Sequence, residues 1–114
     1  MAKYECRLNG DFDGLLNNLD SGILSGSMSA SLENGSDYRN KNMRCAVRVY
    51  ERYSMTGGNR LSMNITLAGE GDELFISVIT AGGSQAMLFK FNTFGEENFL
   101  QHAVQIIERY KNSR

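Results

Sequence analysis

Proline and tryptophan are absent from this chain of 114 residues, histidine occurs once, and cysteine occurs twice. Without proline, the turns depend on Gly, Asn, Asp and Ser, and polyproline ligands are excluded. The single His102 and the distant pair Cys6 and Cys45 do not supply the ligand set of a zinc site. We therefore predict no metal and no cofactor, and we expect both cysteines to be reduced and buried.

The chain also lacks an excess of either charge and lacks long apolar runs. Its 12 basic and 13 acidic residues leave a formal net charge of −1, which argues against nucleic acid or an anionic membrane as the main partner. No apolar run approaches the roughly 20 residues of a membrane span, and the first residues lack the apolar core of a secretory signal. We expect a cytoplasmic protein with a single domain over residues 1–114.

The first part of the chain carries two alternating patterns with a helical pattern between them. Residues 2–9 alternate and predict a half-buried strand. Asp11 suits a helix N-cap, and the apolar residues after it recur at helical spacing: Phe12, Leu15, Leu16, Leu19 and Ile23. Residues 27–33 alternate again, whereas the polar residues 34–42 predict a connection or a hairpin centred on Asn34-Gly35.

The strongest strand pattern covers residues 43–55. One register is apolar, with Met43, Cys45, Val47, Val49, Tyr53 and Met55; the other holds Arg44, Ala46, Arg48, Tyr50 and Arg52. We assign the apolar register to the core and the arginine register to solvent. Further strands are predicted over 61–67, 73–80 and 85–91, and the second of these is apolar on both faces, which is typical of a doubly covered strand.

The last predicted element is a helix. Thr93 and Glu96 have the spacing of a capping box, and an apolar stripe at helical spacing follows them. The stripe consists of Phe99, Leu100, Ala103, Val104, Ile107 and Tyr110.

The order β-α-β-β-β-β-β-α predicts an α+β fold, in which an antiparallel sheet of five to six strands is covered on one face by two helices. This topology resembles the helix-grip arrangement, in which a curved sheet wraps a long C-terminal helix. Proteins of that shape often hold apolar ligands between sheet and helix, so the resemblance implies a ligand site there. The residues that would line it are Met63, Ile65, Met87, Phe99, Ala103 and Val104.

Four stretches carry a resemblance to a known family: residues 2–4 (AKY), 44–53 (RCAVRVYERY), 81–85 (AGGSQ) and 92–96 (NTFGE). In these stretches the chain resembles a family of small bacterial proteins, mainly from Firmicutes, called domain of unknown function 6054. The resemblance spans the chain, but it implies no activity and no functional residues.

The residues that could carry chemistry give weak signals. His102 has no nucleophile near it in sequence, and the turn 70–73 is better explained as a hairpin than as a calcium site. The loop 81–84 (AGGS) lacks the lysine of a phosphate loop. These features argue against an enzyme.

Arg44, Arg48 and Arg52 share one strand face with Tyr50, a combination that can bind an anion or single-stranded nucleic acid. The simpler interpretation is a solvated face whose arginines pair with acids on neighbouring strands. We therefore predict a non-enzymatic module for a small apolar ligand. The alternative is a protein-interaction or self-assembly domain, and nucleic-acid binding through the arginine face is less favoured.

Overall fold

The computed structural model describes residues 1–53, 60–82 and 89–113, and in the last range the side chains from Gly95 onward. The elements in chain order are β1 (Ala2–Asn9), α1 (Phe12–Ser25), β2 (Ser31–Asn40), β3 (Met43–Tyr53), β4 (Arg60–Glu70), β5 (Glu73–Gly82) and α2 (Phe89–Asn112). The five strands form one sheet in the order β1-β5-β4-β3-β2, and every neighbouring pair is antiparallel. The predicted α+β fold is therefore confirmed.

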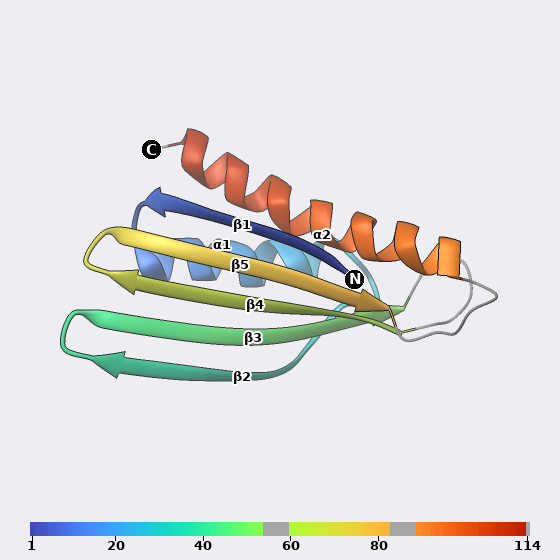
Figure 1. Ribbon diagram of the computed structural model, residues 1–114, viewed down its shortest axis with the longest axis horizontal. Coiled ribbons are helices and arrows are strands. Elements are labelled where there is room, and N and C mark those ends of the chain that lie inside the picture. The colour runs from blue at the N-terminus through green and yellow to red at the C-terminus, as the bar shows by residue number, and fades with distance from the viewer. Residues whose placement is uncertain (54–59, 83–88, 114) are drawn as a thin grey trace.

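Both helices lie on the same side of the sheet, with α1 behind the strands in the view of Figure 1 and α2 along β1 and β5. Asp11 caps α1, because its carboxylate accepts a hydrogen bond of 2.8 Å from the Gly14 N–H. The apolar stripe of α1 and that of α2 meet the alternate residues of β4 and β5. The core includes Leu15, Leu19, Ile23, Met63, Ile65, Leu67, Ile76, Val78, Phe99, Ala103 and Ile107.

Four predicted boundaries are wrong. Residues 27–30 lie ahead of β2 and do not form a strand, although the alternating pattern covers 27–33. Residues 34–40 belong to β2 and not to a connection, and the hairpin turns at Lys41, whose φ is 57°. Residues 89–91 begin α2 and do not form a strand, and the rest of the predicted strand 85–91 lies outside the described residues. The α2 backbone starts at Phe89, ahead of the capping box predicted at Thr93. β2 forms a strand although its side chains are polar, because its backbone pairs with β3 through hydrogen bonds that do not require apolar side chains.

The prediction for the two faces of β3 is also wrong. Tyr50 is fully buried under the helices and Ala46 is 1% exposed, whereas Met43 on the other register is 45% exposed. The arginine register therefore faces the helices. The physical reason is that an arginine has an apolar stem and a planar head: the Arg44 guanidinium lies 4.1 Å from the centre of the Phe12 ring, and Arg52 lies over another ring in the same way.

The described elements cover β5 on one face alone, so the prediction of double cover is wrong as well. Leu74, Ile76 and Val78 are buried under the helices, but Phe75 on the opposite face is 37% exposed. The two cysteines are free and half-buried instead of fully buried.

Candidate functional site

The side of the sheet away from α1 and α2 is covered by no helix or strand among residues 1–53, 60–82 and 89–113. We call this side the open face. It presents alternate residues of all five strands, which the pairing register aligns in rows. Its residues are Lys3, Glu5 and Arg7; Asn34, Ser36, Tyr38 and Asn40; Met43, Cys45, Val47, Val49, Glu51 and Tyr53; Arg60, Ser62, Asn64, Thr66, Ala68 and Glu70; and Glu73, Phe75, Ser77 and Ile79.

β3 gives the open face its apolar centre. All of its outward residues except Glu51 are apolar, and they include Val47 and Val49 in the middle of the strand. Large apolar side chains on this face reach solvent: Tyr38 is 62% exposed, Tyr53 53% and Phe75 37%. An antiparallel sheet with one wet face normally carries polar residues there, so β3 has the reverse of the expected pattern.

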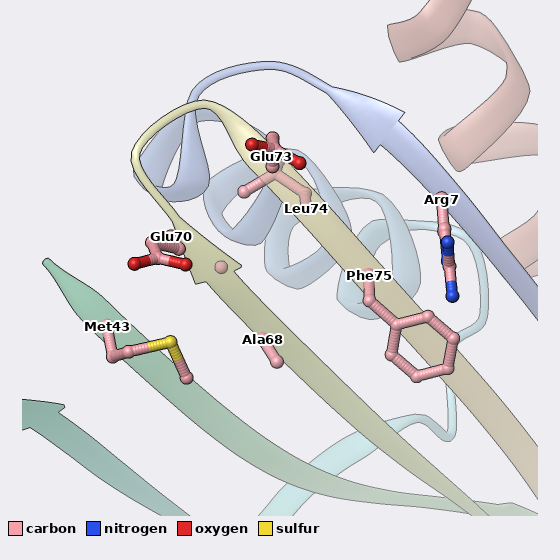
Figure 2. Close-up of a pocket in the computed structure, with 8 residues that line it drawn as sticks. Arg7, Met43, Ala68, Glu70, Glu73, Leu74 and Phe75 are labelled. Atoms are coloured by element: carbon pink, nitrogen blue, oxygen red, sulfur yellow. The ribbon is translucent and has the colours of Figure 1, made fainter.

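A shallow groove crosses the open face at the end where β3 begins and β4 ends. Its volume is about 260 Å³, and Figure 2 shows Arg7, Phe75, Ala68 and Met43 beside one another on β1, β5, β4 and β3. Glu70 and Glu73 lie at the same end of the sheet, where they flank the hairpin between β4 and β5. The groove is therefore apolar at its floor and acidic at its rim.

Charged residues also lie at two further margins of the open face, whereas its β2 edge is polar and uncharged. On β1, the Lys3 Nζ lies 4.0 Å from a carboxylate oxygen of Glu5. At the far end of β4, Arg60 contacts the Glu51 carboxylate and lies 3.4 Å from that of Glu33. An apolar centre inside a polar and partly charged rim is the usual composition of a protein interface.

The residues predicted as an anion or nucleic-acid face have mixed environments on the covered side. Arg44 pairs with Asp13 of α1 at 2.8 Å, and Arg48 pairs with Asp37 of β2 at 3.2 Å. The Tyr50 hydroxyl donates a hydrogen bond to the Asp20 carboxylate, whose pKa is raised by burial although Arg48 partly opposes this. Arg52 stacks on the Phe99 ring at 4.4 Å and pairs with no acid within residues 1–53, 60–82 and 95–113.

Four of the six residues predicted to line an apolar ligand site lie in the core. Met63, Phe99 and Ala103 are fully buried and Ile65 is 1% exposed, while Val104 is half-buried against the same cluster. Met87 lies outside the described residues. The ligand site between sheet and α2 stays a prediction.

Sequence reasoning missed the open face because it assigned the apolar register of β3 to the core. One signal was available: Glu51 interrupts the apolar register, while Tyr50 and Ala46 interrupt the arginine register. A large aromatic between two arginines indicates that the arginine side can be the covered one.

A protein-family model described as "Family of unknown function (DUF6054)" matches residues 1–111. The chain belongs to this family. Membership in DUF6054 confirms the resemblance seen in the sequence, and it brings no activity with it. Comparisons with curated proteins and with solved structures give no match.

Within the described ranges, no group of three or more His, Cys, Asp or Glu side chains is placed to hold a metal ion. None of the helices described here has both the length and the apolar character needed to cross a membrane. Ser84, which would have to join His102 in a catalytic cleft, is outside the described residues.

Proposed function

We propose that this DUF6054 protein is a self-assembly domain that pairs with a second copy of itself through the open face. One observation carries the proposal: β3 directs its apolar register, with Val47 and Val49 at its centre, away from the protein's own helices. Covering that register removes apolar surface from water, at about 25 cal/mol for each Å². A second identical sheet is the partner of matching shape that the chain itself supplies.

The size of the open face suits a stable dimer. With strands about 4.8 Å apart and a rise of about 3.3 Å per residue, a five-stranded sheet of this length presents an area on the order of 800 Å². A standard protein interface buries about 800 Å² on each partner. Two sheets packed face to face lie about 10 Å apart, so their side chains interdigitate as in the core of a sandwich.

Charge complementarity also favours a second copy. The arrangement uses a two-fold axis that lies between the two sheets, parallel to both, and runs across the strands at the level of the middle of β4. Rotation about this axis places each strand over its own copy, and the two copies run in opposite directions. Arg60 at one end of β4 then faces Glu70 at the other end of the partner strand. In the same arrangement Lys3 faces Glu5 of the partner and Val47 faces Val49, because these residues lie in the two rows on either side of the axis.

The first test is the mass in solution. Size-exclusion chromatography with light scattering, over a range of concentrations, should give twice the chain mass of 12.7 kDa. Val47→Lys places a charge at the centre of each buried face, and we expect it to weaken the dimer at least tenfold, or about 1.4 kcal/mol. Asn17→Lys on the exposed surface of α1 is the matched control and should leave the dimer unchanged. A wild-type protein that is monomeric at every concentration overturns the proposal.

The second test addresses the arrangement of the two copies. Arg60→Glu and Glu70→Arg should each weaken the dimer, because each places like charges opposite one another. The double variant should restore part of the lost affinity, since the exchange rebuilds both contacts between the copies but not the ion pairs of Arg60 with Glu51 and Glu33 of its own chain. Two single variants that do not affect the dimer, or a double variant weaker than both, would refute this arrangement while leaving the open face as the interface.

Native mass spectrometry separates this proposal from the earlier prediction of a small apolar ligand. A dimer without additional mass supports self-assembly. A monomer that releases a small molecule on denaturation instead supports a site between the sheet and α2, near Met63 and Phe99.

A further inference from the structure

A second concave site lies on the covered side of the sheet, away from the open face. It has a volume of about 370 Å³, and β3, α2 and the residue that ends α1 all contribute to it. Its lining is polar and consists of Gly26, Arg52, Asn98, Gln101, His102 and Gln105. The volume is in the range of small-molecule sites.

Arg52 is the principal charge in this site; it stacks on the Phe99 ring, and no acidic side chain among the described residues pairs with it. Its Nε is buried and has no hydrogen-bond partner among the described residues. Burial lowers the pKa of its guanidinium, which nevertheless stays charged at neutral pH. The two arginines in the same register, Arg44 and Arg48, both have aspartate partners. A half-buried guanidinium without an acid is costly, so its retention needs an explanation.

His102 is held beside Arg52 by a close approach to the end of α1. A Cβ added at Gly26 would lie 1.8 Å from Cε1 and 2.0 Å from Nε2 of His102, so the imidazole fills the space that any other residue would occupy. The pKa of His102 is lowered, first by burial and then by the positive charges of Arg52 and Arg109. The two arginines come from β3 and from α2 itself, so the potential at the imidazole is positive from both elements.

Among the described residues, the lining contains donors for an anion and no carboxylate to compete with it. Asn98, Gln101 and Gln105 are exposed amides on one side of α2, about one turn apart. The C-terminus of α1 contributes a partial negative charge of about one half. The full charge of Arg52 outweighs it, so the site is positive overall.

We infer that this site binds a small molecule through a phosphate or carboxylate group, with the Arg52 guanidinium contacting two of its oxygens. A planar guanidinium and an oxyanion form two parallel hydrogen bonds. The volume exceeds that of the anion alone, so the rest of the molecule contacts the amides of α2. The site does not depend on the proposed dimer, because it is on the opposite side of the sheet.

The probes are inorganic phosphate and acetate, each titrated at constant ionic strength into ¹⁵N-labelled protein. The readouts are the Arg52 Nε–H signal and the His102 ring signals in NMR spectra. We expect saturable shifts of both residues with at least one probe. Saturation with phosphate alone assigns the ligand as a phosphate ester, and saturation with acetate alone assigns it as a carboxylate. Linear shifts with both probes overturn the inference.

Arg52→Gln should weaken binding at least tenfold. Its control is Arg39→Gln, which removes the same charge from an exposed arginine of β2 that forms no ion pair within the described part of the chain, and should change binding less than twofold. Equal weakening by both variants would mean that net charge alone attracts the anion, which overturns the site.

A second variant tests the same site in case Arg52→Gln does not fold. Asn98→Asp introduces a carboxylate into the lining at an exposed helix position and should abolish saturable binding. Asn112→Asp makes the same change at the last residue of α2 and should retain saturable binding. Binding that survives Asn98→Asp contradicts the inference.

Discussion

Gly22 of α1 lies against α2, and its replacement by alanine tests how closely the two helices pack. A Cβ at this position would lie 2.5 Å from Cδ1 and 3.0 Å from Cγ1 of Ile106. Ile106 is 8% exposed and is part of the core. The added methyl group must therefore displace Ile106 or separate the helices.

Two opposing terms set the size of the effect. In an exposed helix, replacing glycine by alanine stabilises the protein by about 1 kcal/mol. Inserting a methyl group into a packed contact destabilises it by about 1–3 kcal/mol. We expect the packing term to be larger, with a net loss of up to about 2 kcal/mol for Gly22→Ala. In a domain of about 100 residues, each 1 kcal/mol lowers Tm by about 4–8 °C.

The assay is urea denaturation at 25 °C followed by circular dichroism. Gly14→Ala is the control in the same helix, since its Cβ would meet only the side chain of Asp11, with the nearest oxygen at 3.0 Å. The same oxygen accepts the capping hydrogen bond from the Gly14 N–H, so it shifts by only a few tenths of an ångström, and this variant should be about as stable as the wild type. A loss of stability is therefore expected at Gly22 and not at Gly14.

Ile106→Val provides the rescue, because valine lacks the Cδ1 atom that the new methyl group meets. Alone it should cost about 0.5–1.5 kcal/mol. Combined with Gly22→Ala it should restore part of the lost stability, which a double-mutant cycle measures as a favourable coupling. A Gly22→Ala protein as stable as Gly14→Ala would refute the close packing of α1 on α2.

Three further predictions concern polar groups. The buried Thr80 hydroxyl donates a hydrogen bond of 3.0 Å to the Glu96 carbonyl, so Thr80→Val should cost about 1 kcal/mol in urea denaturation; an unchanged stability would contradict that bond. Burial raises the pKa of Asp20 above 3.8 in the folded state, so its contribution to stability is present below pH 3.8 and is lost as the pH rises through the folded pKa. Asp20→Asn should therefore gain stability relative to the wild type between pH 3.8 and pH 7, and unfolding curves that keep a constant difference across this range would refute the assignment. Gly26→Ala should expel the His102 imidazole, return the pKa of His102 toward 6.5 in an NMR titration and weaken phosphate binding; a pKa that stays low would show that the ring keeps its place.

Local patterns in the sequence were sufficient to predict α1. The cap at Asp11 and the apolar stripe from Phe12 to Ile23 interact within a few residues of one another, so they can be recognised without knowing the fold. The turn at 70–73 was predicted correctly for the same reason, since Gly71 adopts a φ of 61° within the turn itself.

The extent of β2 could be recognised only from the tertiary structure. Its residues carry no strand pattern, and it forms because β3 offers a row of backbone donors and acceptors beside it. Backbone hydrogen bonds of this kind are nearly independent of side chains, so the sequence of β2 contains little trace of them.

The two candidate sites also depended partly on the sequence and partly on the tertiary structure. Alternation along β3 identified by itself which residues share a face, because successive side chains of a strand point to opposite sides. It did not identify which face the helices cover, since alternation is symmetric between the two. That choice depends on contacts between distant elements: Tyr50 reaches Asp20 of α1, and Arg52 lies on the Phe99 ring of α2. The sequence alone therefore determined the composition of the two faces, and the packing of α1 and α2 decided that the apolar one is left open.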